Sequence, residues 1–125
     1  MRGRLQISIN FLKNLMRVPF NGQAVRGGDV IDLGGGHALD FIIAPNLHWP
    51  DSMFSFDKAT NIMFTCDAFG SHYCSEDPWD TDVAAVLPHY RFYYDCLMKP
   101  NSRSVTTALR KVCARWHCSR SLFQS

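Results

Sequence analysis

Two residues of the sequence, His48 and Asp67, have the chemistry and the surroundings of metal ligands. His48 lies in a short stretch bounded by Pro45 and Pro50. Proline fixes φ and favours extended geometry in the residue before it, so this loop can hold a side chain stiffly. Asp67 directly follows an apolar run that has the pattern of a strand. Because imidazole and carboxylate groups suit Zn, Fe and Mn, the two residues predict a metal site if the fold brings them to one rim of a sheet.

Each of these residues also has an ordinary structural interpretation. A loop histidine can donate a hydrogen bond to a backbone carbonyl, and an aspartate can cap a turn. His72, five residues after Asp67, is either a surface group or an outer hydrogen-bond partner, and Asp51 could play the second part too. Metal-bound histidines are usually oriented by such a partner. We assign no catalytic residue from the sequence.

Two consecutive hairpins are expected to position His48 and Asp67. Apolar runs and partial alternation predict four strands, at residues 30–33, 37–44, 52–56 and 62–66. Gly34–Gly36 forms the first turn, since glycine reaches positive φ without steric cost. A hairpin brings its two ends together, so residues that follow the second and the fourth strand can share one edge despite 19 positions of separation.

Helices are expected before and after these strands in the sequence. The predicted segments are residues 8–17, 82–87, 90–98 and 101–112. Pro19 ends the first segment, and Asp82 caps the second, which we expect to be interrupted near Pro88. Residues 113–125 have weak periodicity and are expected to form a tail.

Charge and composition exclude several classes of protein. Thirteen Lys and Arg against eleven Asp and Glu leave +2, which is too small for a strongly basic nucleic-acid binder. Residues 29–95 carry all eleven acids and only two basic side chains, so carboxylate chemistry is sought there, although most of these residues have an ordinary interpretation as solvated loop groups. The longest apolar stretches, 41–44 and 83–87, are far shorter than the ~20 residues that cross a bilayer. Five cysteines without a Cys-x-x-Cys repeat argue against a disulfide framework and favour a reducing compartment.

Two blocks, Pro45–Phe54 (PNLHWPDSMF) and Cys66–His72 (CDAFGSH), resemble the flavodiiron proteins in their metallo-β-lactamase-like domain. The turn at 32–37 and the segment Phe92–Asn101 are most similar to the branch found in cyanobacteria and photosynthetic eukaryotes. The resemblance extends from about residue 11 to residue 112.

For the fold, the resemblance implies an α+β chain that forms part of an αββα metallo-β-lactamase-like sandwich, incomplete at both ends. It implies that His48 is an iron ligand and that Asp67 is the carboxylate that bridges two irons. The family's His-x-Glu-x-Asp-His run and its later His-Gly segment have no counterpart here. We therefore expect a partial diiron domain at 1–112 and a divergent tail at 113–125.

For function, the resemblance implies a fragment of an oxidoreductase that reduces dioxygen or nitric oxide at a non-heme diiron site, inactive as this chain alone. In this family FMN in a flavodoxin-like domain supplies the electrons, the subunits pair head to tail as homo- or hetero-oligomers, and phototroph members add a domain using NAD(P)H. Such proteins act as a photosynthetic electron outlet, which implies the chloroplast stroma for a eukaryotic source and the cytoplasm for a cyanobacterial one. Two alternatives stay open: a non-catalytic interaction or assembly module, and a mononuclear metallo-hydrolase of the same superfamily.

Overall fold

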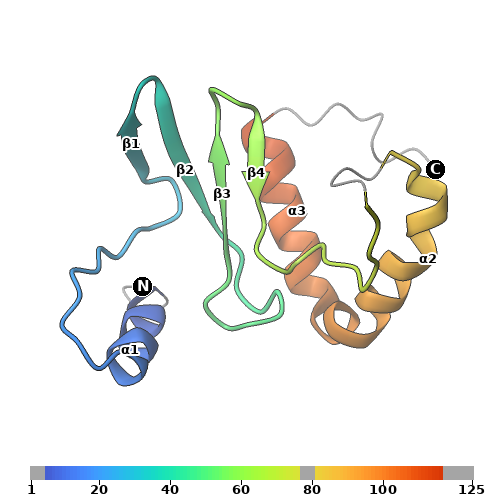
Figure 1. Cartoon of the computed structure of the whole chain (residues 1–125), viewed down its shortest axis with the longest axis horizontal. Helices are drawn as coiled ribbons and strands as arrows, with labels where there is room; N and C mark the ends of the chain where they lie inside the picture. The colour runs from blue at the N-terminus through green and yellow to red at the C-terminus, as the bar shows by residue number, and fades with distance from the viewer. Residues whose placement is uncertain (1–4, 77–80, 117–125) are drawn as a thin grey trace.

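The computed structural model describes residues 5–76 and 81–116 (Figure 1). The elements are helix α1 (Leu5–Leu15), strands β1 (Val30–Gly34), β2 (His37–Ile43), β3 (Met53–Asp57) and β4 (Ile62–Phe64), and helices α2 (Val83–Tyr93) and α3 (Ser102–Trp116). A π-helical turn, Tyr94–Met98, and a 3₁₀ turn, Lys99–Asn101, connect α2 to α3. The strands form an antiparallel sheet in the order β1-β2-β3-β4.

The predicted hairpins are confirmed. Gly34, Gly35 and Gly36 all have positive φ, at 79°, 62° and 87°, which is the backbone that the tight β1–β2 turn requires. The register pairs Ile42 with Phe54 across β2 and β3, so these two side chains point to the same face of the sheet. The loop after β2 and the loop after β4 therefore emerge at the same edge of the sheet, the one formed by the carboxyl ends of these two strands.

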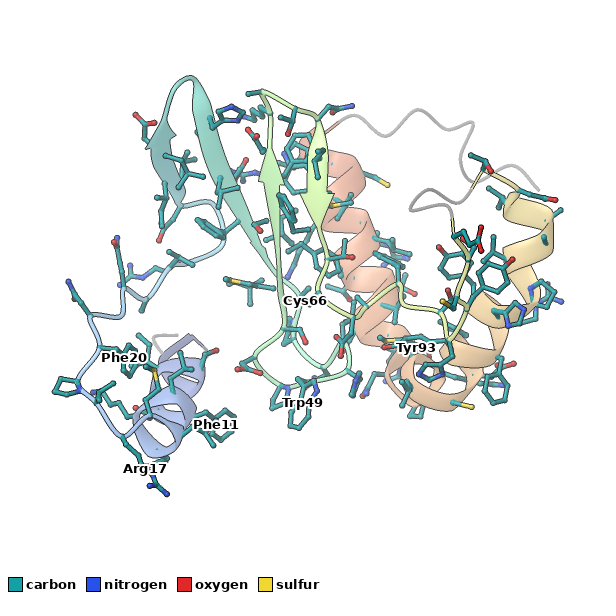
Figure 2. The ribbon with its side chains drawn as sticks, in the orientation of Figure 1. Phe11, Arg17, Phe20, Trp49, Cys66 and Tyr93 are labelled. Atoms are coloured by element: carbon teal, nitrogen blue, oxygen red, sulfur yellow. The ribbon has the colours of Figure 1, made fainter. Side chains whose placement is uncertain are left out.

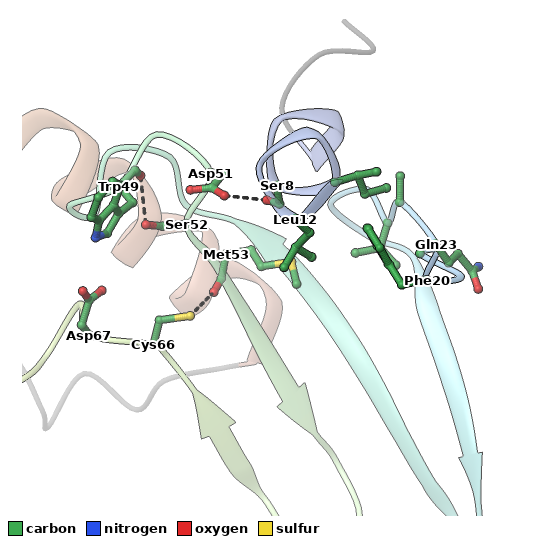
Figure 3. A pocket seen from close by; sticks show the side chains of 14 residues that line it. Ser8, Leu12, Phe20, Gln23, Trp49, Asp51, Ser52, Met53, Cys66 and Asp67 are labelled. Carbon is green, nitrogen blue, oxygen red and sulfur yellow. Dashed lines mark hydrogen bonds between the residues drawn. The ribbon is translucent and has the colours of Figure 1, made fainter. Parts of the chain in front are cut away.

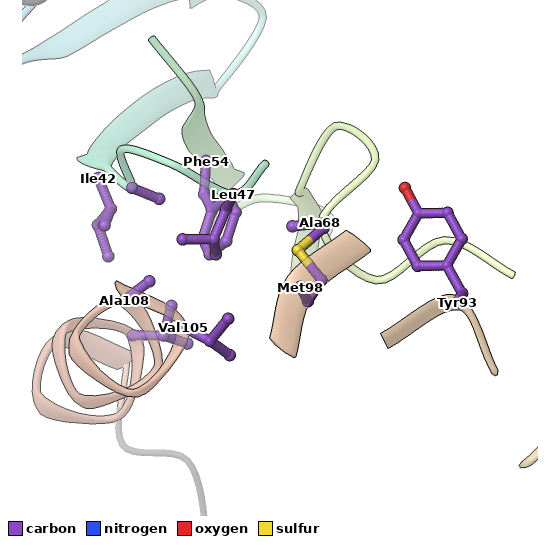
Figure 4. Close-up of a cluster of buried hydrophobic side chains, with 10 residues drawn as sticks. Ile42, Leu47, Phe54, Ala68, Tyr93, Met98, Val105 and Ala108 are labelled. Carbon is purple, nitrogen blue, oxygen red and sulfur yellow. The ribbon is translucent and has the colours of Figure 1, made fainter. Parts of the chain in front are cut away.

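One face of the sheet is covered by α3, and the hydrophobic core lies between them (Figure 4). Phe54 is completely buried, and Leu47, from the loop after β2, is 1% exposed. Val105, Ala108 and Val112 of α3 recur at intervals of three and four, so they form one apolar stripe that packs into this cluster. The core also takes in Ala68, Tyr93 and Met98, which ties the chain after β4 and the end of α2 to the same cluster.

The expected interruption at Pro88 is wrong, because α2 runs through this proline to Tyr93. Proline removes one intrahelical hydrogen bond, to the residue four positions earlier. Here both Ala84 and Pro88 are exposed, so solvent can hydrate the released carbonyl. The predicted cap is confirmed, since the Asp82 carboxylate accepts a hydrogen bond from the Ala85 N–H at 3.1 Å.

Helix α3 continues four residues past the predicted end of the last helix, to Trp116. The reason is tertiary: the Arg115 Nε donates to a carboxylate oxygen of Asp40 at 2.7 Å, and the Trp116 ring packs on Phe56 at 4.5 Å between centroids. Asp40 is 2% exposed, and its hydrogen bond raises the pKa of Arg115. The expected tail at 113–125 is therefore wrong for residues 113–116, which are helical, whereas residues 117–125 lie outside the described residues and the tail there stays a prediction.

The sheet face opposite α3 keeps large apolar side chains in solvent. Ile62 and Phe64 of the edge strand β4 are 45% and 53% exposed, whereas Met63 between them points toward the core. A bare apolar face beside an unpaired strand edge favours association between chains.

We predict that the isolated chain is marginally stable and associates through this face. Ile62→Lys with Phe64→Lys should shift the chain toward monomer in light scattering, because charges on an edge strand oppose strand pairing. Leu87→Lys, at a 49% exposed position on α2, is the matched control and should leave association unchanged. A sharp cooperative thermal transition of a monomeric, unsubstituted chain would contradict this prediction.

A second prediction concerns the far end of the sheet, where the Asp57 carboxylate lies 2.7 Å from His37 Nδ1 and accepts the Thr60 hydroxyl at 2.9 Å. The hydrogen bond from His37 is the main cause that lowers the pKa of Asp57 from 3.8 to about 2. Because the folded pKa is depressed, this stabilisation is present above pH 3.8 and is lost as the pH falls toward 2. Urea unfolding should show Asp57→Asn destabilised near pH 6, with the difference closing by pH 2.

The control for that experiment is Asp95→Asn, which removes an exposed pair with Lys99 and should have little effect at any pH. A destabilisation by Asp57→Asn that stays constant down to pH 2 would show that the carboxylate charge is not its cause.

Candidate functional site: a histidine and an aspartate at one edge of the sheet

The loop that carries His48 is held by a buried side chain and by a serine. Leu47 is anchored in the core, and the Ser52 hydroxyl donates to the carbonyls of Leu47 and Trp49 at 2.8 and 2.9 Å. The Asn46 N–H closes the turn by donating to the Trp49 carbonyl at 2.8 Å. Ser52 and Leu47 therefore hold the loop in addition to the two prolines.

The loop that carries Asp67 is a tight turn directly after β4. Cys66 has a φ of 54°, which turns the chain out of the strand, and the Gly70 N–H donates back to the Asp67 carbonyl at 3.1 Å. Ala68 is buried in the core, so the turn is fixed on its inner side while the Asp67 side chain faces outward, 44% exposed.

The two loops bring the predicted pair together. His48 Nε2 lies 3.0 Å from Asp67 Oδ2, and the side chains are 28% and 44% exposed. This is hydrogen-bonding distance, and both groups remain accessible from solvent. The predicted convergence of these residues is confirmed, and their role as metal ligands stays a prediction.

A pocket of about 580 Å³ lies beside the pair, between α1 and the ends of the strands (Figure 3). Asp67 and Trp49 border it at one end, and the walls are mostly apolar, with Leu12 from α1 and Met53 from β3. The Ser8 hydroxyl of α1 donates to the Asp51 carboxylate at 2.6 Å, which links the helix to the loop of His48.

The hydrogen bond of Asp51 and the ring contact of His72 are with residues other than the pair. The carboxylate of Asp51 accepts the hydrogen bond from Ser8, and the ring of His72 makes an edge contact with the ring of Tyr93 at 5.4 Å between centroids. Their predicted part as outer hydrogen-bond partners of His48 stays a prediction.

The residue that sequence reasoning missed is Tyr93, labelled in Figure 2. Its hydroxyl donates to the backbone carbonyl of Asp67 at 2.7 Å. Burial, and secondarily the charge of Asp67, raises the pKa of Tyr93, which favours the protonated hydroxyl that this hydrogen bond requires. The aromatic run at 90–94 signals a packed face, but nothing in it distinguishes Tyr93 from its neighbours.

The number of donor groups limits which metal site these residues can form. This edge supplies one imidazole nitrogen and one carboxylate, and the described residues hold no cluster of three or more His, Cys, Asp or Glu side chains that could bind a metal ion. Each iron of a diiron centre needs several nitrogen or oxygen ligands. The residues present therefore do not fit a diiron pair by themselves.

The fold and the pair define a partial metallo-β-lactamase-like domain with an edge site. Residues 10–116 match the family described as "ODP family beta lactamase", and the chain belongs to this family. It is 51% identical over 107 residues to "Diflavin flavoprotein A 1" of Synechocystis sp. and equally to "Putative diflavin flavoprotein A 3" of Nostoc sp., covering 86% of this chain and 19% of each relative. The chain thus spans about a fifth of the length of these relatives.

Solved structures agree. A metal-soaked flavodiiron core from Synechocystis sp. matches with a TM-score of 0.77 at 35% identity, covering 86% of this chain and 27% of that one. The flavodiiron protein of Giardia intestinalis matches with a TM-score of 0.74 at 27% identity, covering 87% and 26%. The resemblance seen in the sequence and the expected fold class are confirmed. Among the described residues, no helix has the length and apolarity to cross a membrane.

We predict that the His48–Asp67 pair contributes little to stability. A double-mutant cycle of His48→Gln and Asp67→Asn in urea unfolding should give a coupling free energy below about 1 kcal/mol, because both side chains are partly exposed and screened. A coupling of several kcal/mol would mean that the pair serves mainly to hold the fold.

Proposed function

We propose that the chain is the part of a flavodiiron oxidoreductase that supplies His48 and Asp67 to a non-heme iron site. The observation that carries this proposal is the 3.0 Å approach of His48 Nε2 to Asp67 Oδ2. The pair joins two loops from separate hairpins at one edge of the sheet, and half-exposed side chains at such an edge are open to a cation. Nitrogen and carboxylate oxygen are ligands that suit iron.

The same observation limits what the chain does alone. Two donors leave most coordination positions of two irons unfilled, so the remaining ligands have to come from outside the described residues. Their natural source is polypeptide that packs on the sheet face that bears Ile62 and Phe64, since these two large apolar side chains are exposed there. In this proposal the chain by itself has no oxidoreductase activity.

The whole protein, on this proposal, reduces dioxygen or nitric oxide with electrons from FMN, and NAD(P)H is the further donor in members with a reductase domain. Its subunits pair head to tail with identical or related subunits. It serves as an electron outlet of photosynthesis, in the chloroplast stroma of a eukaryote or the cytoplasm of a cyanobacterium. The support is the 51% identity to diflavin flavoproteins of Synechocystis and Nostoc.

A non-catalytic assembly module is the second candidate, and the bare face of β4 favours it. A soluble, cooperatively folding and metal-free chain would support that candidate. A mononuclear metallo-hydrolase needs three protein ligands and an open position at its metal, and the edge in hand supplies two side chains. Iron titration with metal analysis separates the oxidoreductase from the hydrolase.

A chimera tests the leading proposal. Residues 10–116 replace the matching segment of the Synechocystis diflavin flavoprotein, to which this chain is 51% identical. We expect the chimera to retain iron, and His48→Ala or Asp67→Ala to lower the iron content measured by elemental analysis severalfold, because ligands have been removed.

His89→Ala is the matched control, since His89 lies on α2 and its ring packs against Tyr73. It should leave the iron content of the chimera unchanged. Full iron occupancy in the His48→Ala and Asp67→Ala chimeras would refute the proposed ligand role.

A further inference from the structure

Tyr93 reaches the edge site because the chain changes from α-helical to π-helical geometry at the end of α2. Tyr93 and Met98 are five positions apart and are both buried in the core, at 6% and 1% exposure. In an α-helix, residues five apart point about 140° away from each other, at 100° per residue. The π-helical turn Tyr94–Met98, closed by the Lys99 N–H on the Tyr94 carbonyl, adds one residue to the turn and returns both side chains to one face.

The Tyr93 hydroxyl then binds the loop of Asp67 from the side of the core. The Asp67 carbonyl accepts two hydrogen bonds, one from Tyr93 at 2.7 Å and one from the Gly70 N–H at 3.1 Å. The first bond crosses 26 positions of sequence and ties the turn to the core, whereas the second only closes the turn on itself.

The Tyr93 ring supports the same turn through close packing. A Cβ placed on Gly70 would lie 3.1 and 3.2 Å from two ring carbons of Tyr93, so the ring packs closely on the loop and would have to shift by a few tenths of an ångström to admit a methyl group. The edge contact with His72 adds a second point of support further along the loop.

From these contacts we infer that Tyr93 is a positioning residue for Asp67: it fixes the backbone from which the carboxylate projects, and thereby the approach of that carboxylate to His48. The side-chain pair alone cannot do this, because a contact between two partly exposed polar side chains holds its partners weakly. His48 has its own support in Leu47 and Ser52, so both members of the pair are held from the core by separate contacts. The inference deepens the proposed function, but it is stated for the chain without metal.

The test uses the full 125-residue chain and two single substitutions that each remove one hydroxyl. Tyr93→Phe removes the hydroxyl that binds the Asp67 carbonyl, and Tyr94→Phe is the matched control at a neighbouring, 38% exposed position. At fixed pH, Tyr93→Phe should speed amide hydrogen exchange of Gly70 roughly tenfold, as expected for the loss of one hydrogen bond. It should also shift the ¹⁵N resonance of His48 Nε2, whereas Tyr94→Phe should change neither.

The His48 resonance decides between positioning and a merely structural role. If Tyr93→Phe speeds exchange but leaves the His48 Nε2 resonance in place, Tyr93 supports the loop without positioning the pair, and the inference is overturned. Gly70→Ala disturbs the same contact from the side of the loop and should shift the His48 resonance in the same way; no shift would likewise overturn it.

This outcome is separable from the proposed function. A chimera that binds no iron, with the Tyr93 effect on His48 intact, would remove the proposed function and leave the positioning of Asp67 standing. A chimera whose iron depends on His48 and Asp67, with a His48 resonance indifferent to Tyr93→Phe, would do the reverse.

Discussion

The burial of Phe54 and Leu47 against α3 is the interaction on which the rest of the structure depends. Phe54 lies on β3 and Leu47 in the loop after β2, and the two are 0% and 1% exposed in one cluster with Val105 and Ala108. Burying a large apolar side chain contributes about 1.5–3 kcal/mol, which is more than any exposed contact at the edge site contributes. The residue next to Leu47 is His48, so the position of the imidazole follows from hydrophobic packing rather than from its own polar contacts.

The sequence was sufficient for the hairpins and for the convergence of His48 with Asp67, because strand alternation and glycine turns are local signals. It was not sufficient at Pro88, where the outcome depends on whether a released carbonyl reaches solvent, nor at the end of α3, where Arg115 and Trp116 find partners 75 and 60 positions earlier. Sequence reasoning missed Tyr93 for the same reason. Its role depends on a π-helical turn and on a carbonyl in a distant loop, and neither leaves a periodic trace in the sequence.

Several of the acidic groups in residues 29–95 organise nearby backbone rather than gather at one site. Asp32 and Asp82 accept N–H groups of the turns or helix that they precede, and Asp57 accepts Ala59 N–H as well as two side chains. Aspartate is suited to this because its short carboxylate reaches backbone N–H groups two or three residues away. Part of the local excess of negative charge therefore serves turns and a helix start. The carboxylates of Asp57 and Asp67 each reach a histidine instead, and the contact of Asp67 joins two loops at one edge of the sheet.

On the proposed function, the pair bears on how a metal site is held ready when one segment supplies only some of its ligands. A carboxylate and an imidazole in contact satisfy each other, so the edge carries no bare buried charge, and their partial exposure keeps the free energy of separating them small. The scaffold beneath them is the opposite: Leu47 and Ala68 are almost fully buried, and Tyr93 binds the Asp67 carbonyl from the core. Two donor side chains that are weakly coupled, on a backbone that is rigidly held, can give up their mutual contact and bind a cation without a rearrangement of the fold. A site shared between segments needs that combination, since each part has to fold with its own donors in place before the others arrive.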